Sequence, residues 1–449
     1  MTARNPVADP RPASDVSSAV GFVGVGGLCA WILFCHFYPE VAPLLGLSAE
    51  RGRLTGPMAA LFGLVAAALP MVLWSVLVDK VHRRPSTGID WDNPRPVADI
   101  IDISITKLAG LWATWALIAG LYCLGRWYWD DFYAISMQVL GLAAVPLFLL
   151  SIPYVIWLDR VLVEPRDASW HFGAALVGRE AHDPQMIWIH LRAWAVKGFF
   201  TAFMIAIVPA AFAELVGKDW SDQFANPVAF AGILVLLMFV FDEQIGTVGY
   251  ILTMKPLDAQ IRSANPYLAG WVAALACYPP FQLMQGGGPL FYQSNTADWT
   301  YWLGEYPALM WGWAGLLVVL TAIYAWATIA FGIRFSNLTY RGVLTHGPYA
   351  YTRHPAYLSK NAFWWVSVLP FLVTSGSLVD AVRNTFFLGC VSAIYFWRAK
   401  TEEAHLLGED PKYGEYHAWM NRHGLITAPL HRLWQGIAGW RSPVLQAAE

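Results

Sequence analysis

Long apolar runs with few charged residues recur along the chain and are separated by shorter polar or basic segments. A run of about 20 apolar residues is long enough to cross a bilayer as an α-helix. The pattern predicts an all-α, polytopic integral membrane helix bundle with about ten transmembrane helices. The ten apolar stretches lie near residues 18–38, 57–78, 106–124, 133–157, 194–216, 227–251, 267–285, 307–331, 356–374 and 380–398.

Basic residues are divided unevenly between the two sides of the membrane that ten crossings define. Twenty-one Lys and Arg residues fall on the side of the N-terminus and five on the other side. Cytoplasmic loops carry the excess of Lys and Arg in membrane proteins. We therefore expect a multi-pass protein of a bacterial inner (cell) membrane with both termini cytoplasmic. The five residues on the far side are Arg51, Arg53, Arg126, Lys218 and Arg383.

The composition agrees with a lipid environment, because 57% of the residues are hydrophobic and only 13% are charged. Soluble domains carry about 25% charged residues. A net charge of -2 argues against nucleic acid as a partner, and membrane lipids are expected instead. The five cysteines lie in apolar stretches without CxxC spacing, and His171, His182 and His190 match no metal-site pattern, so no metal is expected. The oligomeric state stays open.

A first polar block lies between the eighth and ninth apolar stretches. Residues 347–359 read Gly-Pro-Tyr-Ala-Tyr-Thr-Arg-His-Pro-Ala-Tyr-Leu-Ser. Pro355 suits the first turn of a helix, which places Arg353 and His354 at the cytoplasmic mouth of that helix. Free backbone N–H groups and the helix dipole favour anionic groups at such a position.

A second polar block follows the tenth apolar stretch. Residues 401–406 read Thr-Glu-Glu-Ala-His-Leu, and Tyr413 and Tyr416 come shortly after them. By the charge distribution, this block meets the same membrane face as the first.

Together the two blocks resemble the isoprenylcysteine carboxyl methyltransferase and phospholipid methyltransferase superfamily of integral membrane enzymes. The shared pattern is G-x-Y-x-Y/W-x-R-H-P-x-Y-x-G, a hydrophobic helical hairpin, T-E-E-x-x-L and a late G-x-x-Y. The resemblance covers roughly residues 331–425, and Ser359 replaces the last glycine of the first block. It implies S-adenosyl-L-methionine as cofactor and methyl transfer to the headgroup or terminus of an amphipathic (lipid, isoprenoid or lipidated) substrate at the cytoplasmic face.

The resemblance also implies roles for individual side chains. Arg353 or the helix N–H groups would bind the cofactor carboxylate, and Glu402 or Glu403 would accept from its ammonium or ribose. Tyrosine rings would face the sulfonium by cation–π attraction. Arg353 and Glu403 are expected to be catalytic, and from their interfacial positions these residues should contribute little to folding. The cofactor-binding set is expected to comprise His346, Gly347, Tyr349, Arg353, His354, Pro355, Tyr357, Glu402, Glu403 and Tyr413.

Asp242 and Glu243 lie deep in the sixth apolar stretch. Ionisable residues inside a membrane are costly and usually face the bundle interior or a wet cavity. They are interpreted either as a site for the substrate headgroup or a proton, or as a polar pair satisfied by neighbouring helices.

These observations predict four parts of the chain. They are a cytoplasmic N-terminal tail (1–17), a membrane-embedded helical region of unassigned role (18–306), a methyltransferase-like membrane domain (307–425) and a C-terminal tail (426–449).

Two alternatives remain open. An NADPH-dependent reductase of the sterol-reductase kind has a similar C-terminal architecture, and residues 412–414, Lys-Tyr-Gly, suit it. A non-catalytic transporter or scaffold would use Asp242 and Glu243 instead, although no paired broken helices support it.

Overall fold

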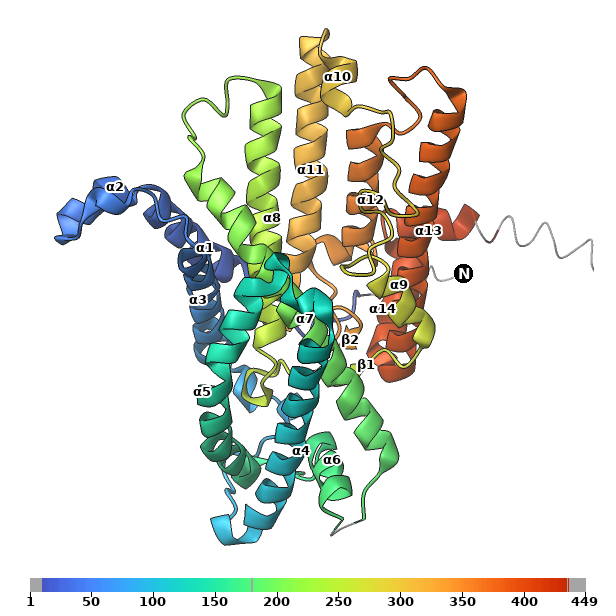
Figure 1. The fold of residues 1–449 in the computed structure, drawn as a ribbon. Helices are drawn as coiled ribbons and strands as arrows, with labels where there is room; N and C mark the ends of the chain where they lie inside the picture. Colours follow the sequence, from blue (N-terminus) through green and yellow to red (C-terminus); the bar gives the residue numbers. More distant parts are fainter. Residues whose placement is uncertain (1–9, 179–180, 434, 436–449) are drawn as a thin grey trace, which may run out of the picture. The chain divides into compact units, whose positions relative to one another are not determined.

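The computed structural model describes residues 10–178, 181–433 and 435 and is 72% helical. Within this described part the strands are β1 (Ser263–Ala264) and β2 (Thr339–Tyr340), which pair antiparallel. The predicted class of an all-α helical membrane protein is confirmed (Figure 1).

Seven helices of the described part are long and apolar enough to cross a membrane. An eighth candidate is α1 (Val20–His36) taken together with the segment Tyr38–Leu45, from which it is bent by 74°. Two of the ten predicted stretches contain the shorter helices α9 (Leu268–Leu275) and α12 (Pro355–Val368), so the count of about ten stays a prediction. The seven spans are α3 with the π turn after it (Pro57–Val78), α4 (Val97–Leu124), α5 (Asp131–Val161), α7 (Pro184–Gly217), α8 (Pro227–Ile251), α11 with the 3-10 turn after it (Pro307–Arg334) and α13 (Leu378–Glu409).

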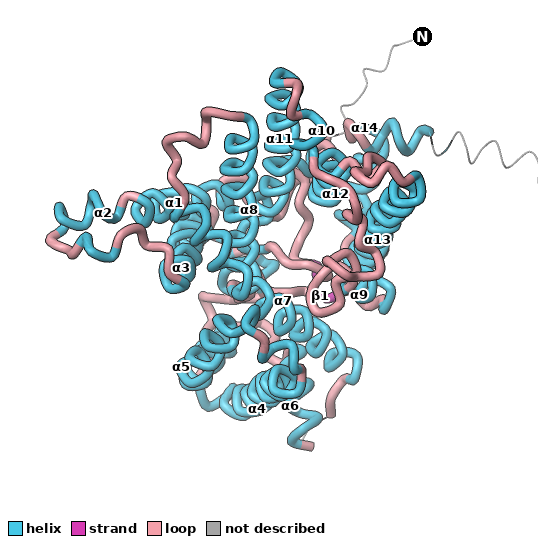
Figure 2. Tube along the Cα trace, turned by 45° about the horizontal axis from the view of Figure 1, so that its top comes forward, coloured by secondary structure: helices cyan, strands magenta, loops and turns pink. Residues whose placement is uncertain are grey.

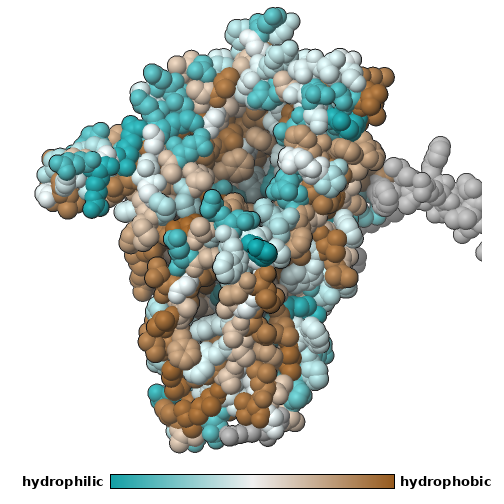
Figure 3. Space-filling model, in the orientation of Figure 1, coloured by the Kyte–Doolittle hydropathy of each residue, from teal (hydrophilic) through white to brown (hydrophobic). Residues whose placement is uncertain are grey.

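Large apolar side chains cover the outward surface of the long helices. On α5, Leu142, Val145 and Leu150 are 80%, 65% and 64% exposed. Figure 3 shows apolar residues gathered over α4 and α5. A surface of this kind is unfavourable in water and favourable against acyl chains, as expected of a multi-pass membrane protein.

The chain folds into two compact units. The N-terminal unit comprises Ala19–Gln282 and Gly332–Arg341, and the C-terminal unit comprises Met1–Ser18, Leu283–Phe331 and Gly342–Glu449. The boundary predicted from the sequence lies after residue 306. In the structure the described residues 10–18 belong with the C-terminal helices.

Small residues let helices of the N-terminal unit approach one another closely. A Cβ atom on Gly27 of α1 would lie 2.2 Å from the carbonyl oxygen of Ala66 in α3. A Cβ atom on Gly173 of α6 (Ala168–Val177) would lie 1.8 Å from the carbonyl oxygen of Thr106 in α4. Any larger residue at either position would push the two helices apart, as at small-residue contacts of membrane helices generally.

Two buried cations join elements of the N-terminal unit. Lys107 Nζ of α4 lies 2.5 Å from Asp159 Oδ1 of α5 and 3.2 Å from Asp167 Oδ2 at the start of α6. The Arg341 guanidinium, which is buried, donates to backbone carbonyls that include the C-terminal end of α8. Carbonyls at a helix end lack intrahelical donors, so Arg341 satisfies that end. Its acceptors are the carbonyls of Gly249, Leu252, Ala259, Ile333 and Phe335.

In the C-terminal unit, α11 and α12 lie beside each other (Figure 2), and the contacts at their ends show that they run antiparallel. Trp313, near the start of α11, donates from Nε1 to the carbonyl of Val366 near the end of α12. The ring of Phe331, at the end of α11, lies 5.2 Å from that of Tyr349, just before α12. The unit also contains α13, the short α10 (Trp299–Leu303) and α14 (Pro411–His423).

Candidate functional site

The loop before α12 brings the first polar block to one end of the C-terminal unit. Gly347 begins a 3-10 turn (Gly347–Ala350) with φ of +59°, a conformation that glycine adopts without strain. A Cβ atom there would lie 3.3 Å from Trp326 Nε1. Pro355 occupies the first turn of α12 as predicted, so Arg353 and His354 stand at the helix entrance.

Glu403 of α13 is the centre of the cluster. Its Oε1 lies 2.8 Å from Arg353 Nε and 3.0 Å from His354 Nε2, and its Oε2 lies 2.8 Å from Lys400 Nζ. Arg353 Nε and Glu403 Oε1 form an ion pair, but their geometry is not that of a hydrogen bond. The Glu403 side chain is only 7% exposed. The two polar blocks, separated by about 50 residues of sequence, thus meet around one buried carboxylate.

Helix α14 closes the other side of this cluster. Asp410 caps it by accepting from the Lys412 backbone N–H at 2.9 Å. Arg353 Nη1 donates to Asn421 Oδ1 at 2.6 Å, and His417 Nε2 lies 3.9 Å from Glu403 Oε2.

Neither His417 nor Asn421 was predicted as a site residue from the sequence. The available signal was their spacing, because Tyr413, His417 and Asn421 recur every four residues and therefore share one face of a helix.

Glu402 points to a different set of partners. It accepts a hydrogen bond from the Tyr357 hydroxyl, and its Oε1 lies 3.9 Å from Arg398 Nη2. The Tyr357 ring stacks on His354 with centroids 5.7 Å apart, and the Arg398 guanidinium lies 4.9 Å from the Tyr357 centroid. The adjacent glutamates therefore serve two connected parts of one polar cluster.

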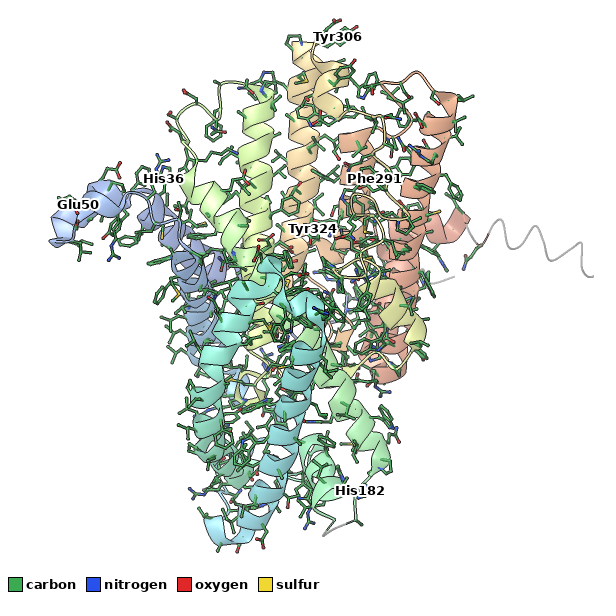
Figure 4. The ribbon with its side chains drawn as sticks, in the orientation of Figure 1. His36, Glu50, His182, Phe291, Tyr306 and Tyr324 are labelled. Carbon is green, nitrogen blue, oxygen red and sulfur yellow. The ribbon has the colours of Figure 1, made fainter. Side chains whose placement is uncertain are left out.

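A further cation, Lys360, lies deeper along α12. Lys360 Nζ is 5.2 Å from the ring of Tyr324 on α11, which Figure 4 labels, and 5.4 Å from that of Trp364. Both Lys360 and Arg398 also lie within 6 Å of the Tyr395 ring, at 5.9 and 5.4 Å. Cation–π contacts of this kind stabilise cations at desolvated positions.

The other predicted tyrosines form the wall of the cluster. Tyr413 is buried, and burial, followed by the nearby Glu403 charge, raises the pKa of its hydroxyl. The hydroxyl of buried Tyr416 donates to the carbonyl of Tyr349 at 2.8 Å. This bond ties α14 to the loop of the first block.

Histidine protonation is suppressed at two positions around the site. Burial, with the Arg353 guanidinium acting in the same direction, lowers the pKa of His417 to about 4. Burial also lowers the pKa of His346. Both rings are therefore neutral near pH 7 and can accept as well as donate hydrogen bonds.

Some buried polar atoms of this region have no hydrogen-bond partner within the described residues. They include Asn361 Oδ1 and His346 Nε2. Buried polar atoms are normally paired, so these two can receive a ligand. Together with Arg353 and Glu402 they offer donors and acceptors on one end of the unit. No group of three His, Cys, Asp or Glu residues in the described part could hold a metal ion.

The predicted substrate residues Asp242 and Glu243 belong to α8 of the N-terminal unit. Glu243 Oε2 is buried and without a hydrogen-bond partner among the described residues. The next residue, Gln244, donates from Nε2 to the carbonyl of Ala60 on α3 at 3.0 Å. This part of α8 is thus polar and faces neighbouring helices.

No family model, no curated protein and no solved structure matches this chain.

Proposed function

We propose that the protein is an S-adenosyl-L-methionine-dependent membrane methyltransferase that acts on the headgroup or terminus of an amphipathic substrate at the cytoplasmic face. The observation that carries the proposal is the meeting of the two polar blocks at Glu403, which contacts Arg353 and His354. Their resemblance to the isoprenylcysteine carboxyl methyltransferase and phospholipid methyltransferase superfamily requires these blocks to form one site.

The chemistry of the donor set fits this cofactor. Arg353 supplies a cation for its carboxylate, while Glu402 and the unpaired Asn361 Oδ1 supply acceptors for its ammonium or ribose hydroxyls. Tyr357 and Tyr413 supply aromatic faces for a sulfonium. When bound, the cofactor supplies a methyl group that leaves sulfur as it bonds to a nucleophilic oxygen, nitrogen or sulfur of the acceptor.

In this proposal the chain's own residues act by positioning. Glu403 holds Arg353 and His354 at fixed distances from each other, and Asn421 fixes the other end of the guanidinium. A preorganised site gains rate because the reactants are held in a productive geometry, without proton transfer if the acceptor is already ionised.

Ten crossings are part of the proposal, and one of them is a return crossing before α11. Arg341 donates to Gly249 and Leu252 at the end of α8 and to Ile333 just after α11. In the proposal the chain crosses the membrane between α8 and α11. We assign this crossing to residues 265–306, where backbone without a long helix needs burial in protein.

The ninth crossing is assigned to α12 and the residues that follow it. Asn295 Nδ2 donates to Asp380 Oδ2 at 2.9 Å, and Thr296 donates to the carbonyl of Leu372. At the other end of α12, His354 contacts Glu403. Since α12 joins these two ends, it returns the chain across the membrane between α11 and α13.

Ligand-dependent stabilisation of the detergent-purified protein tests the function. S-adenosylhomocysteine at 100 times its dissociation constant should add about 2.7 kcal/mol to the free energy of unfolding. NADPH should add nothing. Stabilisation by NADPH alone would replace this proposal with the reductase, and stabilisation by neither would favour a non-catalytic role.

A further inference from the structure

The segment of residues 10–18, here called the N-terminal strap, is bound to the loop that precedes the first polar block. Asp15 N–H donates to the Val343 carbonyl at 2.8 Å, and Val343 N–H donates back to Asp15 Oδ2 at 2.7 Å. Thr345 Oγ1 donates to the Pro12 carbonyl at 2.8 Å.

The same strap contacts α14. Asp15 Oδ1 lies 2.5 Å from Lys412 Nζ, with the two side chains 25% and 31% exposed. The Arg11 guanidinium lies 5.8 Å from the ring centroid of Trp419. One carboxylate thus joins the loop of the first block to the helix that follows the second.

Strap and site occupy opposite faces of α14. At about 100° per residue, Trp419 lies within about 20° of Lys412 around the helix, whereas His417 and Asn421 lie about 140° and 180° away. Lys412 and Trp419 contact the strap, while His417 and Asn421 contact Glu403 and Arg353. The helix is therefore held between the strap and the charged cluster.

We propose that Asp15 is a positioning residue, through which the N-terminal strap holds α14 against the Arg353–Glu403 cluster and completes the cofactor site. The inference rests on the proposed methyltransferase function. Asp15 itself does not touch the cofactor. It acts through Asn421, whose carbonyl oxygen fixes Arg353.

The test compares Asp15→Ala with Asp380→Ala in the full chain. Asp380 is a matched control, because it also accepts hydrogen bonds, from Asn295 and Ser375, and pairs with a basic residue, Arg383 at 3.3 Å. It lies at the opposite end of the C-terminal unit. Titration of S-adenosylhomocysteine should give a dissociation constant raised about three- to tenfold for Asp15→Ala, as for loss of a partly exposed ion pair, and unchanged for Asp380→Ala.

Two further measurements separate positioning from general stabilisation. Asp15→Asn keeps an acceptor for Val343 N–H but loses the charge opposite Lys412. Its dissociation constant for S-adenosylhomocysteine should therefore lie between those of wild type and Asp15→Ala. In a double-mutant cycle for ligand affinity, Asp15→Ala should add little once Asn421 is Ala, because both act on Arg353. Additive effects of the two replacements would show that Asp15 does not act through α14.

Docking of the strap has a readout that needs no ligand. A cysteine at Val16, which is buried, should react slowly with a maleimide in the wild-type background and faster with Asp15→Ala. If wild type and Asp15→Ala bind S-adenosylhomocysteine equally well, this inference is overturned and the proposed function stands. Wild type that does not bind the ligand would remove the proposed function as well.

Discussion

Replacing Glu403 by Gln is the most informative single change in the cluster, because the substitution keeps the shape and removes the charge. Arg353 and His354 then face a neutral amide, and both side chains are largely buried, at 12% and 18% exposed. A hydrogen bond to a charged group contributes about 1.5–3 kcal/mol, against about 0.5–1.5 kcal/mol for a neutral one. The hydrogen bond with His354 and the buried ion pair with Arg353 together predict a loss of about 2 kcal/mol in the free energy of unfolding.

Lys400 adds little to this figure, because its side chain is 49% exposed and surface ion pairs contribute about 0–1 kcal/mol. The matched control is Glu402→Gln. Glu402 accepts from Tyr357 and lies 3.9 Å from Arg398, so its replacement weakens one close contact and should cost about 1 kcal/mol.

Thermal unfolding in detergent, with and without S-adenosylhomocysteine, measures both effects. Without ligand, Glu403→Gln should melt below Glu402→Gln, which should melt below wild type. With ligand, Glu403→Gln should bind about tenfold more weakly, because Arg353 is no longer fixed and a charge-assisted bond of about 1.5–3 kcal/mol is at stake. Equal melting and equal affinity for the two variants would refute the central role of Glu403.

Three more predictions follow from particular side chains. The folded-state pKa of His417 is lowered to about 4 from 6.5, so the unfolded chain binds this proton first and the free energy of unfolding should fall as pH drops from 6.5 towards 4. Between pH 7.5 and pH 5 the melting temperature should therefore decrease less for His417→Gln than for wild type. Arg341→Lys should sharply reduce yield and melting temperature, because an ammonium cannot reproduce the planar donors that bind its buried carbonyls, and normal melting would contradict this. Cysteines at the exposed positions Tyr351 and Leu425 should label from the cytoplasmic side, and one at exposed Phe371 only from the opposite side; labelling of the first two from different sides would rule out a shared site.

The long helices could be predicted from sequence because a bilayer leaves a spanning segment no other way to pair its backbone groups. The stretches near 267–285 and 356–374 were also predicted to cross the membrane, yet α9 ends at Leu275 and α12 at Val368. Pro279 and Pro280 remove backbone donors within the first of these stretches. An apolar stretch indicates residues that favour the membrane interior, but it does not predict how many of those residues are helical.

The site could be predicted only as far as local motifs reach. The expectation that Arg353 and Glu403 are wet is wrong, because their side chains are 12% and 7% exposed. The reason is α14, which folds over the cluster and contributes His417 and Asn421, neither of which was predicted. The contribution of Arg353 and Glu403 to folding stays a prediction. The contact between Asp15 and Lys412 has no local pattern at all, since it joins residues 397 positions apart.

The separation of the strap from its partners sets an order of events during biosynthesis. Asp15 leaves the ribosome before both of its partners, because Val343 follows 328 residues later and Lys412 397 residues later. At translation rates of about 5–20 residues per second, the interval before Lys412 appears is about 20–80 s. Until then the strap can bind only to the loop at Val343 and Thr345, and its partner on α14 is missing. The hydrogen bonds between the strap and the first-block loop can therefore form before the ion pair with α14, and a chain that stops before α14 can form the former but not the latter.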